Sequence, residues 1–315
     1  MAGERASDVD ARASLRVGRE AEARLADGRR LAYVVHGDES GFAVVLEHGT
    51  PASRLGLGFT DAPARARGVR VICPDRPGIG RSDPARHRTL LEWADDVAGL
   101  MDALGIDRFG VVGYSCGGPH ALACAARLPG RVGAVGLMAG SGPLDRPAAF
   151  EGLNAVDRWL AMTSARRPRL AALALRLQAA VARRAPGIAL RGLMREVGDA
   201  DRRRLAVLGP ELMRVVLAEA TRQGPDGVID DYRRWVAPWP FALDAIDAPV
   251  DIWQGDDDRG IPMHHAEDLA ARLPRATLHR LAGEGHFSIA AHFDAILDSL
   301  LAAALTDAPR STAST

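Results

Sequence analysis

The stretch FGVVGYSCGG, residues 109–118, decides the fold of this sequence. An apolar run typical of a strand, Phe109–Gly113, leads into a Gly-x-Ser-x-Gly pattern, and the Ala-rich segment Gly117–Arg127 that follows is typical of a helix. So tight a turn holds its central residue in a strained conformation, and the flanking glycines remove conflict with neighbouring elements. We therefore expect the Ser115 hydroxyl to be exposed at a sheet edge, beside a helix N-terminus that favours developing negative charge. A helix cap followed by a glycine-rich turn is the alternative interpretation.

Short apolar runs alternate with amphipathic segments on both sides of this stretch. The predicted strands are Glu22–Ala26, Arg30–His36, Ala43–Glu47, Val69–Cys73, Phe109–Gly113, Val132–Met138, Val250–Trp253 and Thr277–Leu281. The predicted helices are Leu90–Leu104, Gly117–Arg127, His264–Leu273 and Ile289–Leu305. This alternation predicts an α/β fold in which a mostly parallel sheet carries helices on both faces. The turn signal Asp27-Gly28 predicts a hairpin that supplies an antiparallel edge.

Residues 143–240 break this alternation. They contain three long helical patterns and no convincing strand, and the alternation resumes after them. The helical patterns are Asn154–Met162, Arg169–Arg184 and Asp201–Arg222. We therefore predict an all-helical cap, 143–240, inserted into a core made of residues 19–142 and 241–305. Polar tails without periodicity are expected at residues 1–18 and 306–315.

The composition excludes several classes of protein and mechanism. The formal net charge is zero, so no global field attracts nucleic acid or an anionic membrane. All 40 basic residues are arginine, which excludes a Schiff-base lysine, a phosphate-binding P-loop lysine and a Ser-Lys dyad. The three cysteines are too few for a disulfide framework or a zinc site, and Cys73 and Cys124 are expected to be buried apolar residues.

The sequence also allows predictions about the location of the protein in the cell and about its binding partners. Residues 1–19 lack the apolar centre of a signal peptide, and no run reaches the roughly 18 apolar residues that a membrane span needs. We therefore expect a cytoplasmic protein with no membrane span, no nucleic-acid partner, no metal and no cofactor. A small-molecule substrate is expected, and the oligomeric state is left open.

A serine nucleophile needs a base and an acid, and both follow later strands. His286 follows the run Thr277–Leu281 and opens the last predicted helix, which makes it the candidate base. Three aspartates follow the run Val250–Trp253. The pattern Gly-x-x-Asp-x-x-Ile-Pro selects Asp258 as the acid, and leaves Asp256 and Asp257 as turn or capping residues.

An acyl-transfer site also needs two donors for the oxyanion. One is expected to be the backbone N–H of Cys116, the residue after the nucleophile, so that the thiol itself plays no part. The other is expected from the loop His48-Gly49-Thr50-Pro51, with the Thr50 N–H as the best candidate and His48 as a residue that orients the loop.

Five landmarks occur in order between about residues 20 and 305. They are His48-Gly49-Thr50-Pro51, Asp75-Arg76-Pro77-Gly78-Ile79-Gly80-Arg81-Ser82, the turn at Ser115, Gly255 with Asp258, and Gly285-His286. Together they resemble the α/β-hydrolase superfamily, and residues 223–241 resemble the cap-to-core return of its bacterial members. The resemblance implies an eight-stranded sheet, a Ser-His-Asp triad, a two-amide oxyanion hole and a helical cap. Epoxide hydrolases and haloalkane dehalogenases of this fold carry Asp where this chain has Ser115, which shifts the expectation from alkyl chemistry to acyl transfer.

The expected reaction is hydrolysis of a carboxylic ester or lactone of an apolar small molecule through an acyl-enzyme. Amide cleavage, C–C bond hydrolysis, acyl transfer or perhydrolysis at the same site remain alternatives, and so does a non-hydrolytic ligand-binding protein on the same scaffold.

The predicted cap carries the candidates for substrate contact. Its apolar residues are interpreted either as a pocket wall or as plain core packing. The candidates, with one residue of the Ser115 turn, are Tyr114, Trp159, Met162, Trp235 and Trp239. The stretch Arg166–Arg204 contains eleven arginines and three acids, and is interpreted either as a site for an anionic group or as a solvated face.

Overall fold

Eight strands form one sheet in the computed structural model, which describes residues 18–306. Their order in the sheet is β1-β2-β4-β3-β5-β6-β7-β8. Strand β2 is antiparallel to both of its neighbours, and all the other pairs are parallel. The strands are β1 Arg19–Arg24, β2 Arg30–Gly37, β3 Phe42–Glu47, β4 Val69–Pro74, β5 Phe109–Tyr114, β6 Val132–Met138, β7 Val250–Gly255 and β8 Ala276–Leu281.

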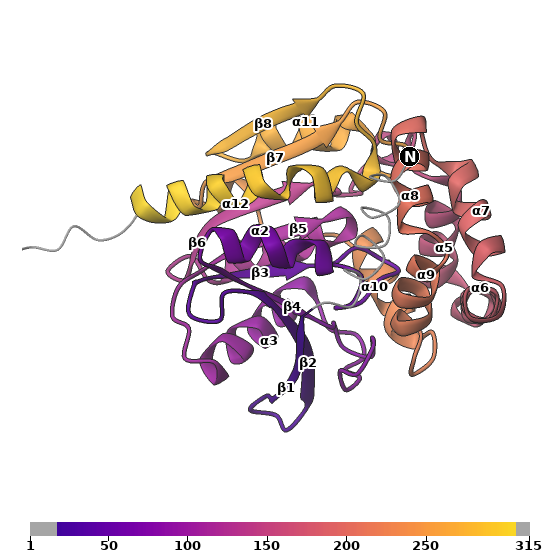
Figure 1. Ribbon diagram of the computed structural model, residues 1–315, viewed down its shortest axis with the longest axis horizontal. Coiled ribbons are helices and arrows are strands. Elements are labelled where there is room, and N and C mark those ends of the chain that lie inside the picture. The colour runs from indigo at the N-terminus through magenta and orange to yellow at the C-terminus, as the bar shows by residue number, and fades with distance from the viewer. Residues whose placement is uncertain (1–17, 307–315) are drawn as a thin grey trace, which may run out of the picture.

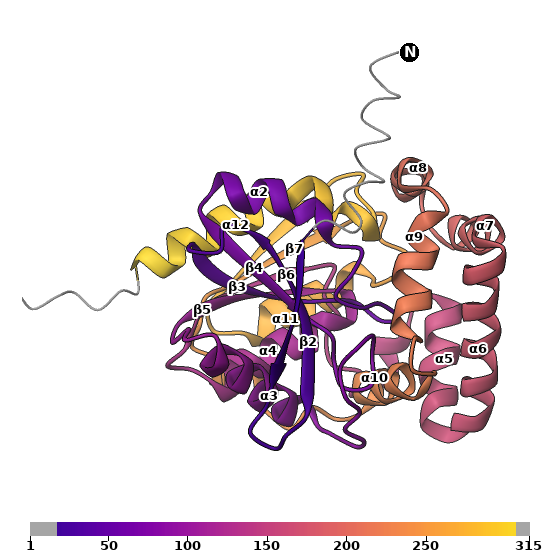
Figure 2. The ribbon, with the colours of Figure 1, turned by 60° about the horizontal axis from the view of Figure 1, so that its bottom comes forward.

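The central strands are buried on both faces because helices cover the sheet on each side (Figure 2). One face packs against α3 (Leu90–Ala103), α4 (Gly118–Arg127) and α11 (Met263–Arg272), and the other against α2 (Asp61–Ala66) and α12 (Ile289–Thr306). Continuous apolar runs suit strands enclosed in this way. The predicted α/β fold with a mostly parallel sheet is therefore confirmed.

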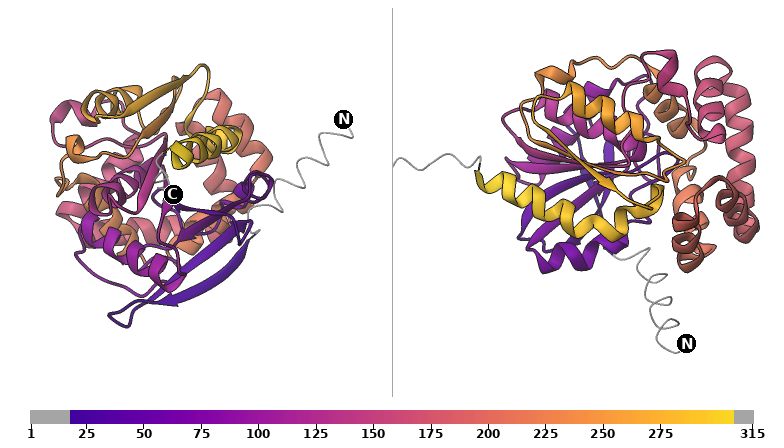
Figure 3. Two further views of the ribbon diagram at one scale, coloured as in Figure 1. Left: turned by 90° about the vertical axis from the view of Figure 1, so that its left-hand side faces the viewer. Right: turned by 90° about the horizontal axis from the view of Figure 1, so that it is seen from above.

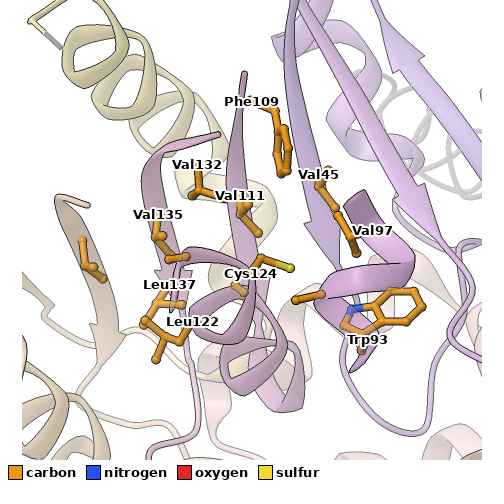
Figure 4. Close-up of a cluster of buried hydrophobic side chains, with 14 of the residues drawn as sticks. Val45, Trp93, Val97, Phe109, Val111, Leu122, Cys124, Val132, Val135 and Leu137 are labelled. Carbon is orange, nitrogen blue, oxygen red and sulfur yellow. The ribbon is translucent and has the colours of Figure 1, made fainter. Parts of the chain in front are cut away.

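The larger apolar cluster lies between the sheet and helices α3 and α4 (Figure 4). Branched side chains from β3, β5 and β6 meet apolar residues of the two helices there. Cys124 is part of this cluster, and Cys73 is fully buried on the opposite face, as the sequence predicts.

Helix α12 meets the length and apolarity of a membrane span, as part of the stretch His286–Ala304. Its residues Phe293, Ile296, Leu297 and Leu300 are fully or almost fully buried against the sheet. Such a helix is typical of a soluble core as well as of a membrane, so its composition alone is weak evidence for a span.

A helical insertion between β6 and β7 lies at one end of the sheet (Figures 1 and 3). Part of its own apolar core includes Ile79, Cys116 and Ile261 of the α/β core, so the two parts pack together. The helices are α5 Ala155–Arg166, α6 Pro168–Arg184, α7 Pro186–Glu196, α8 Asp199–Leu208, α9 Glu211–Met213 and α10 Asp226–Val236; a π-helical turn, η4, spans Arg214–Ala218.

The structure corrects the expected helix at Asp201–Arg222. The chain breaks at Gly209, whose φ of +69° is left-handed, and at Pro210, which has no N–H for a helix. Helices α7 and α10 are two that the sequence analysis did not predict. Strand β1 begins earlier than expected because Arg19 already pairs with Val35, and it ends earlier because the pair Arg24–Arg30 closes the hairpin. The predicted tails lie outside the described residues, apart from Gly18 and Thr306.

Two glycines allow the turn after β5 to pack against its surroundings. A Cβ atom on Gly117 would lie 2.1 Å from the carbonyl oxygen of Glu47, and a Cβ atom on Gly113 would lie 2.7 Å from the Cα of Gly118. No side chain fits at such distances without a backbone shift. The start of α4 is therefore held directly against the end of β3.

We predict that Gly117→Ala lowers the free energy of unfolding by at least about 2 kcal/mol, because its methyl group meets backbone on a neighbouring strand. Gly130→Ala is the matched control: nothing lies within 4 Å of a Cβ atom there, and alanine is expected to be neutral or stabilising by about 0.5 kcal/mol. Urea denaturation of the two variants measures the difference. Equal stabilities would contradict the close approach.

Candidate active site

Ser115 occupies the sharp turn between β5 and the short 3-10 turn η2 (Ser115–Gly117) that leads into α4. Its φ of 56° lies in the left-handed region, which a residue with a Cβ atom adopts only at a cost. Gly49 passes so close that a Cβ atom on it would lie 3.2 Å from the Cβ of Ser115. The strained turn thus presents the hydroxyl to the loop that follows β3.

His286 and Asp258 lie in line with this hydroxyl. The Oγ of Ser115 is 3.0 Å from Nε2 of His286, and Nδ1 of the same ring is 3.0 and 3.1 Å from the two carboxylate oxygens of Asp258. The three residues come from the ends of β5, β7 and β8, which lie at the same edge of the sheet. The structure therefore brings together the three residues that the sequence analysis singled out.

The carboxylate of Asp258 is fully buried and accepts hydrogen bonds from three further donors. It accepts the backbone N–H groups of Gly260 (2.7 Å) and Ile261 (2.9 Å), and the side-chain amide of Gln254 (3.0 Å). The two neighbouring aspartates bind other residues. Asp256 accepts a hydrogen bond from the backbone N–H of Gly283, and the carboxylate of Asp257 lies 3.4 Å from the guanidinium group of Arg259. Asp258 is thus the aspartate of the three that orients His286.

The surroundings of His286 favour its protonated form. Burial alone lowers the pKa of the ring, but the carboxylates of Asp258, Asp201 and Asp157 that face it raise the pKa above the usual value of 6.5. Such a shift makes the imidazole a stronger base for the Ser115 proton.

The loop after β3 is held by a buried arginine. Arg76 donates to the carbonyl oxygens of His48 (2.8 Å) and Gly49 (3.0 Å) and to the hydroxyl of Thr50 (3.1 Å). Asp231 of α10 pairs with Arg76 at 2.7 Å and accepts the Thr50 hydroxyl at 3.1 Å. These contacts fix the backbone of the loop beside Ser115, where a second oxyanion donor is needed.

The imidazole ring of His48 is neutral in this loop. Burial lowers the pKa of its ring to about 3. The neutral ring donates from Nδ1 to the carbonyl oxygen of Gly49 at 2.8 Å. This agrees with a residue that orients the loop and does not exchange protons.

A cavity of about 1000 Å³ opens over Ser115, between the sheet edge and the helical insertion. Thr50, Cys116 and His286 lie in its wall. Most of the remaining wall is apolar and comes from the insertion, including Leu160, Leu193, Val197, Leu212, Met213 and Leu217. A space of this size and character suits an apolar small molecule.

The predicted substrate contacts divide into two groups. Tyr114 and Trp235 lie in the cavity wall, where the Tyr114 hydroxyl donates to the carbonyl oxygen of His286 at 3.2 Å. Trp159, Met162 and Trp239 lie outside that wall. Trp159 and Met162 line a shallow surface pocket, and Trp239 stacks on Phe241 against the main core.

Several polar groups interrupt the apolar wall. Asp157 accepts the Tyr232 hydroxyl at 2.6 Å, and burial raises the pKa of its carboxyl. Arg204 is the only arginine among the described residues of the wall, and it is paired with Glu284. The described residues contain no cluster of His, Cys, Asp and Glu that could hold a metal ion.

Asp201 of α8 is a site residue that the sequence analysis missed. Its fully buried carboxylate accepts the backbone N–H groups of His286 and Phe287, both at 2.8 Å. It approaches so closely that a Cβ atom on Gly285 would lie 2.3 Å from its Oδ2. The insertion therefore holds the start of the turn that carries His286. Nothing in the Arg-rich sequence of α8 distinguishes Asp201 from its neighbour Asp199, so no sequence signal indicates this role.

Comparisons with known proteins agree with this geometry. A family model described as "alpha/beta hydrolase fold" matches residues 43–208. The 2-hydroxy-6-oxo-6-phenylhexa-2,4-dienoate hydrolase of Burkholderia cepacia is 31% identical over 81% of this chain and 85% of its own length. The non-heme chloroperoxidase of Streptomyces lividans is 27% identical over 88% and 96%. The solved enol-lactonase of Burkholderia xenovorans LB400 superposes with a TM-score of 0.67 over 91% of this chain and all of that one, at 21% identity.

We predict that Asp201→Asn lowers the pKa of His286, because it removes one of the three carboxylates that raise it, while Asp258 and Asp157 remain. Since the neutral ring is the base, the acid limb of the activity profile on nitrophenyl acetate moves to lower pH. Loosening the His286 turn also lowers kcat by about 100-fold. NMR titration of the histidine rings and the pH dependence of kcat/KM measure the two effects.

Asp199→Asn is the matched control for this prediction. Asp199 lies on the same helix, is exposed and pairs with Arg202, away from the His286 turn. We expect the pKa of His286 to be unchanged in this variant. If both variants left the pKa and kcat unchanged, Asp201 would have no positioning role.

Proposed function

The chain belongs to the alpha/beta hydrolase fold family, and on this premise we propose that it hydrolyses a carboxylic ester or lactone of an apolar small molecule. The observation that carries the proposal is the contact of 3.0 Å between the Ser115 hydroxyl and Nε2 of His286, at the floor of an apolar cavity. We propose further that residues 143–240 act as a cap over that cavity, on a core of residues 19–142 and 241–305.

The first half of the proposed reaction forms an acyl-enzyme. His286 takes the proton of Ser115 as its oxygen attacks the carbonyl carbon of the substrate, and the Asp258 carboxylate stabilises the imidazolium that results. The tetrahedral intermediate then collapses. The alcohol oxygen leaves with the proton that His286 returns to it, and the acyl group stays on Ser115.

The negative charge of the intermediate needs donors that are already in place. We assign this role to the backbone N–H groups of Cys116 and Thr50. Both residues lie in the cavity wall beside Ser115, and the loop that carries Thr50 is held by Arg76 and Asp231. The side chain of Cys116 takes no part, since burial raises the pKa of its thiol well above neutral.

In the second half, water replaces the alcohol. His286 removes a proton from a water molecule, the hydroxide attacks the acyl carbon, and a second tetrahedral intermediate forms in the same oxyanion hole. Its collapse releases the carboxylic acid, and His286 returns the proton to Ser115. A lactone opens by the same steps, and its alcohol and acid remain in one molecule.

C–C bond hydrolysis is the second candidate, and the Burkholderia cepacia relative favours it. The 2-hydroxy-6-oxo-6-phenylhexa-2,4-dienoate in its name contains no ester or amide, so its hydrolysis must break a carbon–carbon bond next to the ketone. That substrate also carries a carboxylate. In the described cavity wall Arg204 is already paired with Glu284, and Asp157 and Glu196 add acidic groups. These charges favour an uncharged ester over an anionic dienoate.

We predict that the protein turns over nitrophenyl acetate and butyrate, and that Ser115→Ala lowers kcat/KM by at least about 1000-fold, because no other group replaces the nucleophile. Cys116→Ser is the matched control, since it keeps the backbone N–H and is expected to retain most of the activity. Release of nitrophenol measures both.

The same experiment separates the two candidate functions. Turnover of a 2-hydroxy-6-oxo-dienoate without turnover of either ester would favour the C–C hydrolase. Turnover of neither class, or a fully active Ser115→Ala variant, would contradict the proposed site.

A further inference from the structure

The large apolar side chains that remain exposed are all found in the helical insertion, as far as the structure describes the chain. They are distributed over α5, α6, α7 and α8, and the α/β core contributes none. They are Val156, Trp159, Leu170, Leu173, Leu177, Val181, Ile188 and Val207. So concentrated a set is typical of an interaction surface, whereas single exposed apolar residues need no explanation.

Helix α6 shows the arrangement most clearly, because it buries mostly small residues and leaves its larger apolar residues exposed. Four of the five residues that it buries are alanines, and the fifth is Leu175. The opposite face carries Leu170, Leu173, Leu177 and Val181, whose spacing of three and four residues places them side by side. Leu177 and Val181 also line the cavity over Ser115. A surface helix that faced only water would direct such residues inward.

Arginines occur along the same helices as many of these apolar residues. Residues 166–195 contain eight arginines and no acid, although the whole chain has zero net charge. All eight are exposed, and none forms an ion pair with a described residue, whereas many arginines elsewhere do. They are Arg166, Arg167, Arg169, Arg176, Arg183, Arg184, Arg191 and Arg195. We call these arginines and the exposed apolar residues together the apolar–arginine face.

Four residues of the apolar–arginine face also belong to the wall of the cavity over Ser115. Val156, Leu177, Val181 and Val207 are exposed and also line the cavity. Helices α6 and α7 form the outer edge of the molecule, away from the sheet, in two views (Figures 1 and 2). A flat partner placed against that edge would therefore lie close to helices that form part of the cavity wall.

We propose that the apolar–arginine face docks on an anionic lipid surface. Leucines that project from a helix suit the boundary between headgroups and acyl chains, and arginines beside them suit the lipid phosphates. Residues of the cavity wall then lie beside the lipid, which suits a substrate that is itself amphiphilic. The docking itself does not depend on the proposed esterase chemistry.

A second copy of the chain would fit the apolar–arginine face less well than an anionic lipid surface. A two-fold symmetric contact would place the face against itself, with eight unpaired cations from each copy. Like charges brought together in this way oppose association. An anionic surface instead supplies the counter-charge that the described residues do not.

The test is sedimentation of the full chain with phosphatidylcholine vesicles, with and without phosphatidylglycerol. We expect binding to the anionic vesicles that weakens with salt, and little binding to phosphatidylcholine alone. In the triple variant Arg169→Gln, Arg176→Gln and Arg183→Gln the partition coefficient is expected to fall by about 100-fold, since each arginine near an anionic surface contributes about fivefold.

Two controls separate docking from general charge and from folding. Arg24→Gln, Arg127→Gln and Arg275→Gln change the net charge equally on exposed sites of the α/β core, and should leave binding within about twofold of the parent. Leu173→Ser with Ile188→Ser removes apolar residues outside the cavity wall, and should reduce vesicle binding but leave turnover of soluble nitrophenyl acetate unchanged.

Three outcomes would overturn the proposal. They are no binding to anionic vesicles, equal loss of binding in the core triple variant, and a dimer in light scattering that Leu173→Ser with Ile188→Ser dissociates. Because sedimentation needs no turnover, a failure of docking is distinguishable from a failure of the proposed esterase function.

Discussion

The left-handed backbone of Ser115 is the constraint on which the site depends. A residue with a side chain holds a φ of 56° only where its surroundings fix it. Here the close packing of Gly117 on the end of β3 and of Gly49 on Ser115 supplies that support. The glycines, the parallel strands and the buried loop after β3 therefore all serve one purpose, which is to hold a hydroxyl within reach of His286.

The helical insertion also helps to hold the residues of the site in place. Two buried carboxylates reach from it into the core: Asp231 holds the loop of Thr50 through Arg76, and Asp201 holds the turn of His286. Movement of the insertion would therefore disturb both the proposed oxyanion donor and the proposed base. Its outer side carries the apolar–arginine face, so the same helices meet the site on one side and a surface on the other.

Much of this could be predicted from the sequence, because strands, their order of appearance and the turn at Ser115 have local patterns. Asp258 could also be chosen among three aspartates by its spacing from Gly255 and Pro262. The roles of Asp201 and Asp231 could not, because each depends on a contact across a long loop of chain that no local pattern encodes. The position of Trp159 outside the cavity wall could not be predicted either, because helical spacing shows that a face is apolar but not what it faces.

The most direct test of the central claim is mass spectrometry of the protein after treatment with a fluorophosphonate, which reacts with an activated serine. We predict one adduct, located on the peptide that contains Ser115, and its loss in His286→Ala, where no base activates the hydroxyl. An unmodified protein, or an adduct on another residue while Ser115 stays free, would contradict it.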